Sequence, residues 1–158
     1  MKTAAYWIEK LGLTQHVEGG AFKETYRSPL VLSNLPRDFK GARNASTTIY
    51  FLLQDGEFSA LHKIAADEGW HFYEGTPLTV YEIEANGNLI KHTLGRDFEK
   101  GETFQCTIKA GSWFGSRVEN GGYALVGCTV APGFDFADFE LANRDVLLQQ
   151  FSHHEKLI

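Results

Sequence analysis

The sequence predicts an all-β fold, a small barrel or sandwich with a short helix near each end. Three observations support this prediction. From Gly12 to about residue 132, apolar residues recur with a period of two, which is typical of half-buried strands. Turn dipeptides that contain glycine separate these runs. Helical spacing of apolar residues occurs only near the two ends of the chain.

The first predicted element is an N-terminal helix. Its apolar residues lie at positions i, i+3, i+4 and i+7, which form one helix face: Ala4, Trp7, Ile8 and Leu11. Thr3 can cap the first turn, and Gly12 can end the helix. We expect the apolar stripe to lie on the body of the protein.

The middle of the chain is predicted to form eight or so short strands. The apolar runs are 21–28, 47–53, 58–64, 70–75, 78–85, 88–94, 103–110 and 123–131. Asp55-Gly56, Asn86-Gly87 and Asn120-Gly121 stand between runs, and we expect each to supply the positive φ angles of a tight hairpin turn. Many short strands joined by such turns predict a β-sandwich or barrel.

A second helix is predicted near the C-terminus. Val146, Leu147 and Phe151 carry the apolar pattern, and Asn143 can cap the start. There is no internal repeat or linker. Because 158 residues with 43% hydrophobic content can bury one good core but hardly two, we expect a single domain over residues 1–158.

The net charge argues against a nucleic-acid partner. Lys and Arg number 15 against 20 Asp and Glu, so the chain is acidic, with a net charge of −5. No basic surface is expected to hold phosphates.

Several patterns predict a cytoplasmic protein. Glu9 and Lys10 interrupt the first apolar run, so no signal-peptide core forms, and no run approaches the length of a membrane span. Cys106 and Cys128 lie in strand-like runs, where a buried, reduced thiol is common. We therefore expect neither a membrane partner nor a disulfide framework.

A segment around His62 is dense in histidine, acidic and aromatic residues. Its spacing is Gly56, five residues, His62, one residue, Ile64, three residues, Glu68, six residues and Gly75. This spacing resembles the first motif of the cupins. In that family two histidines and the glutamate bind a metal inside a jelly-roll barrel, and here Ile64 stands where the second histidine belongs.

The segment KAGSWFGSRV is similar to the second cupin motif. Lys109 stands at the proline position, Gly111 at the glycine and Phe114 at the last histidine ligand. Together with EGGAFKETYRS and CTVAPGFDFADFEL, these motifs resemble one branch of the superfamily, small cupins of unknown function, over nearly the whole chain. The resemblance implies a cupin jelly-roll barrel, a double-stranded β-helix, that encloses a cavity and forms a homodimer. Val17 departs from the branch, in which proline is common at that position.

Ligand counting argues against a bound metal. Transition-metal sites normally use three or four side chains, and the cupin spacing leaves only His62 and Glu68. The alternation from Glu68 points Trp70 and Phe72 inward and His71 outward, unless a bulge intervenes. We expect no metal and no other cofactor.

His62 and Glu68 remain as a candidate general acid/base pair. Aromatic side chains are expected to line the cavity around them: Tyr50, Trp70, Phe72 and Phe114. In the alternative interpretation, each member of the pair only satisfies the hydrogen bonds of the other. Arg27 suits a carboxylate or phosphate on a small ligand. Glu18 and Arg27 could bring opposite charges to the cavity mouth, but the favoured interpretation of Glu18 is a surface ion pair on an edge strand. His16 is interpreted as a solvated or capping histidine.

Three functions remain open, and the sequence leaves open whether the protein is an enzyme. The first is a metal-independent isomerase or epimerase, by analogy with the sugar-nucleotide epimerases that share the cupin barrel. The second is a non-catalytic protein that binds a small, partly polar metabolite in the barrel. The third is a metal-dependent cupin with a substituted ligand set. Ile64 and Phe114 argue against the third, and nothing in the sequence separates the first two.

Overall fold

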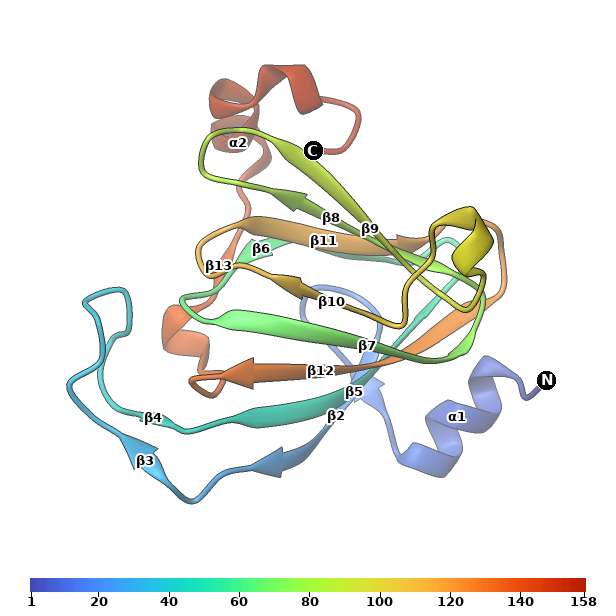
Figure 1. Ribbon diagram of the computed structural model, residues 1–158, viewed down its shortest axis with the longest axis horizontal. Coiled ribbons are helices and arrows are strands. Elements are labelled where there is room, and N and C mark those ends of the chain that lie inside the picture. Colours follow the sequence, from blue (N-terminus) through green and yellow to red (C-terminus); the bar gives the residue numbers. More distant parts are fainter.

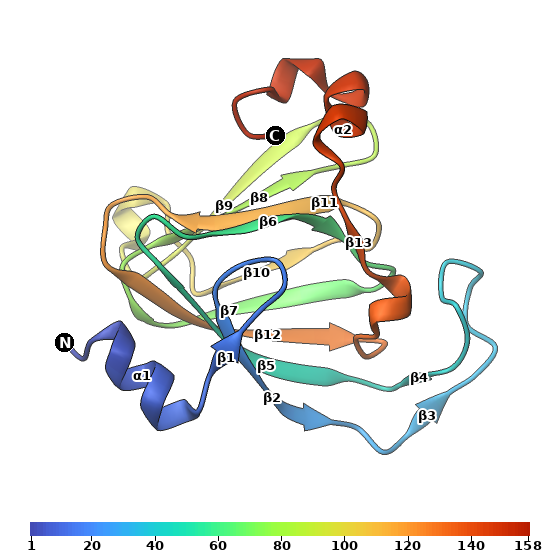
Figure 2. The same ribbon diagram turned by 180° about the vertical axis from the view of Figure 1, so that it is seen from behind.

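Two antiparallel sheets face each other across the interior of the barrel (Figures 1 and 2). The computed structural model describes all residues from 1 to 158. The six-stranded sheet has the order β1 (Thr14–Gln15), β2 (Ala21–Arg27), β5 (Thr47–Gln54), β12 (Tyr123–Ala131), β7 (Asp67–Gly75) and β10 (Gln105–Ile108). The five-stranded sheet has the order β13 (Glu140–Leu141), β6 (Phe58–Lys63), β11 (Trp113–Val118), β8 (Leu78–Ile83) and β9 (Leu89–Leu94).

Successive strands pass repeatedly between the two sheets, as in a jelly roll. The all-β jelly-roll prediction is therefore confirmed. A small ribbon of β3 (Val31–Leu32) and β4 (Arg43–Asn44) extends from the ends of β2 and β5 (Figure 1). Three single-turn 3₁₀ helices complete the chain: η1 (Phe98–Lys100), η2 (Phe136–Asp138) and η3 (Ser152–His154).

Every predicted strand run contains a strand, but the prediction missed β11. Gly115 interrupts its apolar pattern, as a turn residue would. The structure gives a different reason for this glycine, because a Cβ at Gly115 would lie 2.6 Å from the carbonyl oxygen of Ser59. The glycine allows β6 to approach β11 closely, and the strand continues through it.

The three turn dipeptides differ in what they connect. Gly56, Gly87 and Gly121 all have positive φ angles, of 79°, 88° and 74°. Only Asn86-Gly87 closes a hairpin, between β8 and β9. The hairpin prediction is wrong for the other two, because Asp55-Gly56 joins β5 to β6 and Asn120-Gly121 joins β11 to β12, strands of opposite sheets. A positive φ specifies a sharp reversal of the chain, not the partner of the next strand.

Both predicted helices are present. In α1 (Ala4–Leu11) the hydroxyl of Thr3 accepts a hydrogen bond from the Tyr6 N–H at 3.1 Å, and Gly12 ends the helix with a φ of 65°. Its apolar face packs on the outer face of the six-stranded sheet, beside Leu52 and Leu125. In α2 (Arg144–Gln150) the Asn143 side chain accepts from the Val146 N–H. Neither helix has the length and hydropathy of a membrane span.

The core between the sheets contains 16 buried residues, Trp70, Phe72 and Phe114 among them. The alternation along β7 is as predicted, with Glu68, Trp70 and Phe72 buried and His71 partly exposed. The bulge in β7 lies at Tyr73, after these residues, so it does not change their direction. Glu68 therefore faces the barrel interior, and the Nε2 atom of His71 lies 3.4 Å from Thr129 on the outer face.

Candidate functional site

A cavity of about 360 Å³ lies inside the barrel, and the buried residues His62 and Glu68 line it. The six-stranded sheet, β6 and the segment after β12 supply its walls. Its ionisable lining residues are His16, Glu18, Glu24, Arg27, His62, Glu68 and Asp135. The apolar part includes Phe22, Ile49, Ile64, Val130, Phe134 and Phe136. Cavities of this size in barrels hold small ligands.

His62 enters the cavity because of a bulge in β6. Phe114 pairs with His62 but Ser116 pairs with Ser59, so β6 has one residue more than β11 between the two pairs. The His62 side chain is only 4% exposed. Its Nδ1 atom lies 2.7 Å from the carbonyl oxygen of Ala60, which can only accept, so Nδ1 carries a proton.

The partner of His62 is Glu18. The Nε2 atom of His62 lies 2.9 Å from the Glu18 carboxylate, and the Glu18 side chain is 9% exposed. The interpretation of Glu18 as a surface residue is therefore wrong. The alternative interpretation, in which His62 and Glu68 only satisfy the hydrogen bonds of each other, is wrong as well, because Glu18 is the hydrogen-bond partner of His62.

Two glycines bring Glu18 to the cavity. Gly19 and Gly20 have φ angles of 109° and 76°, which favour glycine. A Cβ at Gly19 would lie 2.1 Å from the carbonyl oxygen of Phe58, so the loop before β2 touches the β6 backbone. The Ala60 N–H also donates to the carbonyl oxygen of Glu18 at 2.7 Å. The signal in the sequence was therefore the pair of glycines after Glu18, which specify a close approach of two backbones.

Glu18 favours the charged form of His62. Burial, the largest influence, lowers the pKa of His62, but the charge and hydrogen bond of Glu18, the Glu68 charge and the Ala60 carbonyl together raise it above its ordinary value. Both nitrogens of the imidazolium are then satisfied, one by a carbonyl and one by a carboxylate.

Glu68 is a buried carboxyl that titrates near neutral pH. Burial raises its pKa to about 7, against the lowering effect of His62; the Glu18 charge also raises it, and the Cys128 thiol lowers it by a hydrogen bond. The protonated and ionised forms are then both populated near pH 7. Glu68 and His62 interact through their charges and line the same cavity.

His16 also lines the cavity, so its interpretation as a solvated or capping residue is wrong. Its Nδ1 atom accepts a hydrogen bond from the Glu18 N–H at 3.2 Å. Burial lowers its pKa, Glu18 partly offsets this, and His62 lowers it further. His16 is therefore neutral, and its 3.7 Å approach to the Glu18 carboxylate is not an ion pair.

None of the four predicted aromatic side chains lines the cavity, although Phe114 packs beside a residue that does. The Phe114 ring lies 4.1 Å from the His62 ring, centroid to centroid, and packs beside it. Trp70 and Phe72 face inward but belong to the filled core and do not line the cavity. Tyr50 points to the opposite face of β5, toward Tyr73, because Ile49 and Phe51 take the inward positions. Phenylalanines from β2 and from the segment after β12 line the cavity instead.

Arg27 lines the cavity, as predicted, but most of its donors are already used. Its guanidinium forms a bidentate pair with Glu24, at 2.8 and 3.1 Å. Its Nη1 atom donates to the Asn44 side chain and to the carbonyl oxygen of Phe134. Arg27 therefore ties the segment after β12 to β2 at the edge of the cavity.

The donor set does not fit the metal of the cupin pattern. Of the four pattern positions, Ile64 and Phe114 are apolar and buried in the core. Both nitrogens of His62 are already hydrogen bonded. No group of three or more His, Cys, Asp or Glu residues in the chain has the arrangement of metal ligands. His71 cannot complete the set, because it lies on the outer face of β7.

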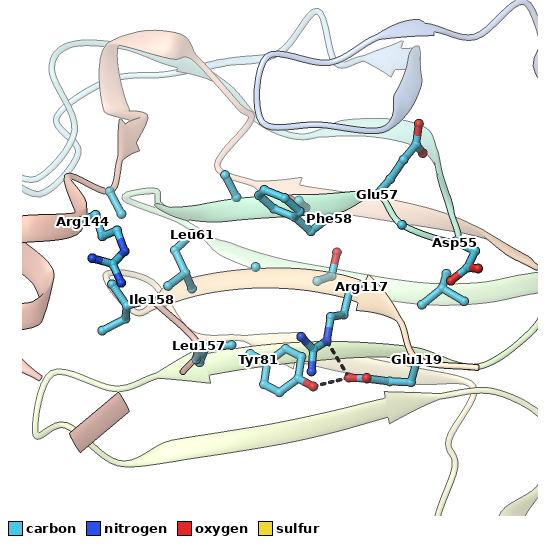
Figure 3. A pocket seen from close by; sticks show the side chains of 17 residues that line it. Asp55, Glu57, Phe58, Leu61, Tyr81, Arg117, Glu119, Arg144, Leu157 and Ile158 are labelled. Atoms are coloured by element: carbon cyan, nitrogen blue, oxygen red, sulfur yellow. Dashed lines mark hydrogen bonds and ion pairs between the residues drawn. The ribbon is translucent and has the colours of Figure 1, made fainter. Parts of the chain in front are cut away.

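A second, larger groove of about 610 Å³ lies on the outside of the five-stranded sheet (Figure 3). Of its charged side chains, Arg117 and Glu119 form an ion pair. Arg117 donates to Glu119 at 3.1 Å, and the Tyr81 hydroxyl donates to the same carboxylate (Figure 3). The groove contains no buried histidine or carboxylate, so the inner cavity is the stronger candidate for a chemical site.

Comparisons with known proteins agree with this architecture. Residues 5–142 match the family model described as cupin superfamily (DUF985). An uncharacterised protein of Saccharomyces cerevisiae, YML079W, is 30% identical over 141 residues, which cover 80% of this chain and 68% of the yeast protein. A hypothetical protein from Leishmania major has a TM-score of 0.93 at 35% identity, over 99% of this chain and 97% of that one. A structure from Shewanella oneidensis has a TM-score of 0.89 at 41% identity, over 99% and 94% of the two chains.

More distant structures share the fold alone. Oxalate decarboxylase from Bacillus subtilis has a TM-score of 0.58 at 14% identity, with 87% of this chain and 34% of that chain covered. The family match, the yeast relative and the two similar structures together identify the family. The chain belongs to the cupin superfamily, in the family DUF985.

Proposed function

We propose that the barrel cavity binds a small, partly polar metabolite and that Glu68 exchanges a proton with it, assisted by the Glu18–His62 ion pair. One observation carries this proposal: a buried histidine–carboxylate pair lines the same cavity as a second carboxyl whose pKa is about 7. A group that titrates near the working pH is suited to general acid/base catalysis. The cavity is also large enough for a small metabolite.

The three side chains have separate roles in this proposal. Glu68 in its ionised form takes a proton from a carbon next to a carbonyl of the ligand. The C–H bond breaks, an O–H bond forms on Glu68, and the electron pair moves onto the carbonyl as an enolate. His62 stabilises the ionised form of Glu68 between turnovers, and Glu18 keeps His62 charged and in place. Return of the proton to the ligand completes an isomerisation or epimerisation without a metal.

A positioned acid/base group of this kind accelerates proton transfer by about 10²- to 10⁴-fold. The second candidate function is a binding protein that uses the same cavity without turnover. The same donors and acceptors would then only orient the ligand. A metal-dependent reaction is the least supported candidate, because Ile64 and Phe114 occupy two of the ligand positions.

The test is exchange of ligand hydrogen with solvent. The protein is purified gently, and molecules that leave with it are identified by native mass spectrometry. The identified molecule is then incubated with protein in D₂O. Wild type and the surface control Glu84→Gln should incorporate deuterium at carbon, and Glu68→Gln should lose at least about 100-fold of that rate. Exchange that is equal in Glu68→Gln, or tight binding without any exchange, would reject the catalytic proposal and favour the binding protein.

A further inference from the structure

The hydrogen-bond donors that face the cavity are largely used within the protein. Arg27 makes four hydrogen bonds: two to Glu24, one to Asn44 and one to Phe134. His62 uses both nitrogens, as described above. A ligand that approaches this site therefore meets few free N–H groups.

The acceptors of the cavity are less well satisfied. Glu68 is 8% exposed, forms no ion pair, and has only the weakly donating Cys128 thiol as a hydrogen-bond partner. One oxygen of Glu18 faces His16 Nδ1, which already accepts a hydrogen bond and cannot donate. Asp135 lines the cavity without an ion pair, although one of its oxygens caps the Ala137 N–H.

The charges of the lining are also unbalanced. Four carboxyl side chains line the cavity against one arginine, and that arginine is paired with Glu24. His62 is likewise paired with Glu18. Neither Glu68 nor Asp135 forms an ion pair, although the charge of His62 lowers the pKa of Glu68. The faces of the phenylalanine rings that line the cavity attract cations as well.

We infer that the cavity selects a small organic cation that carries N–H donors, such as a primary amine, and not a carboxylate or a phosphate. This inference rests on the proposed ligand cavity and names the class of ligand that the cavity accepts. The ammonium group supplies the donors that Glu68 and Glu18 lack. An anionic ligand would meet unpaired carboxyl groups at close range, which is unfavourable in a partly buried site.

The pH dependence of binding follows from the groups around Glu68. His62 faces it from β6, Glu18 from the loop before β2, Cys128 from β12 and Cys106 from β10. A bound cation favours the ionised form of Glu68, so binding below pH 7 releases a proton. The ionised fraction of a group with a pKa of about 7 rises about tenfold between pH 6 and pH 8. Any loss of charge from His62 at higher pH also favours the cation.

The test uses three probes of similar shape and different charge: benzylamine, benzyl alcohol and benzoate. Binding to the full-length protein is measured by isothermal titration calorimetry at pH 6 and pH 8. Benzylamine, which stays cationic at both values, should bind at least about tenfold more tightly than the other two at pH 8. It should also bind about tenfold more weakly at pH 6. Glu68→Gln should remove this pH dependence and most of the affinity, while Glu84→Gln should behave as wild type.

Several results would overturn the inference. Benzoate or benzyl alcohol binding as tightly as benzylamine would show that charge does not select the ligand. Equal affinity for benzylamine at both pH values and in Glu68→Gln would show that the amine binds elsewhere. Absence of benzylamine binding at tens of millimolar would also reject an amine site of this size. A failure here leaves the deuterium-exchange test untouched, because that test does not depend on the charge of the ligand.

Discussion

Two glutamate–histidine pairs lie on either side of Phe114, and only one of them lines the cavity. The neighbouring strands place His62 of β6 and Glu82 of β8 opposite Phe114. His62 pairs with Glu18 at 2.9 Å, and Glu82 pairs with His92 of β9 at 2.8 Å. The distances are nearly equal, so the distance within each pair does not separate a structural role from a functional one.

The surroundings of the two pairs do differ. One oxygen of Glu82 accepts from His92, and the other accepts from the Lys109 N–H at 3.1 Å. Every strong partner of that carboxylate is a fixed part of the fold. Glu18 has one oxygen without a donor, and Glu68 lies close enough to shift the pKa of His62. A pair that keeps an acceptor without a donor beside a cavity is called open here, and it can act on a ligand. A pair whose acceptors are all hydrogen bonded within the protein is called closed, and it stabilises the fold.

The largest expected effect compares removal of the two glutamates. Glu82→Ala leaves the Lys109 N–H and His92 without their acceptor inside the protein, so we expect a loss of about 2–4 kcal/mol in the free energy of unfolding. The Glu82→Ala variant should still carry the co-purifying ligand when it is measured by native mass spectrometry. Glu18→Ala should cost less stability, because His62 can give up its proton, but should lose the ligand. Urea denaturation measures the first quantity. Equal losses of stability and of ligand in the two variants would contradict the different roles of the two pairs.

The next effect concerns the pH dependence of stability. Glu68 ionises near its ordinary pKa of 4.5 when unfolded but at about 7 when folded. Stability therefore falls as the pH rises from 4.5 to 7 and then levels off. The raised pKa of His62 acts in the same direction, since its stabilisation is complete below 6.5 and is lost as the pH passes the folded value.

Glu68→Gln mimics the protonated form, so it should be more stable than wild type at pH 8 by about 1–3 kcal/mol and equal to it near pH 4.5. Urea denaturation across this range gives both quantities. Glu82→Gln is the matched variant, and its curve should keep the slope of wild type. A wild-type curve that is flat between pH 5 and pH 7 would show that Glu68 is not held protonated by burial.

Much of the fold, and about half of the site, could be predicted from the sequence. Local spacing specified α1, most strands and the inward direction of His62 and Glu68, because periodicity is a property of neighbouring residues. Glu18 was misassigned because its position depends on a close contact between the backbones of Gly19 and Phe58, which lie some forty residues apart in the chain. Tyr50 was misassigned for a related reason. It lies on the outer face of β5, and that face is buried by α1 and so is apolar as well. Alternation could not show which face of β5 is inside.

A smaller effect concerns the proton on His62. Glu18 raises the pKa of His62 more than any other residue does, whereas Glu82 has no part in it. Glu18→Gln should therefore lower the pKa of His62 by about one pH unit or more, and Glu82→Gln should leave it unchanged. Nitrogen-15 NMR of the imidazoles measures this directly. In wild type at pH 6 both nitrogens of His62 should carry protons, and Nδ1 of His16 should not. A His62 that titrates alike in both variants would mean that the two pairs do not differ as described.

The smallest expected effect uses the two cysteines as a matched pair. Both are free thiols and both lie opposite Trp70, Cys106 on one side and Cys128 on the other, so they are two strands apart and cannot form a disulfide. Burial is the main cause that raises the pKa of each thiol; the next largest is Glu82 for Cys106 and Glu68 for Cys128.

The Cys128 thiol donates a hydrogen bond that lowers the pKa of Glu68. Cys128→Ala should therefore raise the pKa of Glu68 by several tenths of a unit, which is about the effect of losing one weak donor. The midpoint pH of the loss in stability should rise by the same amount. Cys106→Ala, which removes a neighbour of the closed pair, should leave that midpoint in place. If the two substitutions moved it equally, the thiol of Cys128 would be acting only by its volume, and the contrast between an open and a closed pair would have to rest on Glu18 alone.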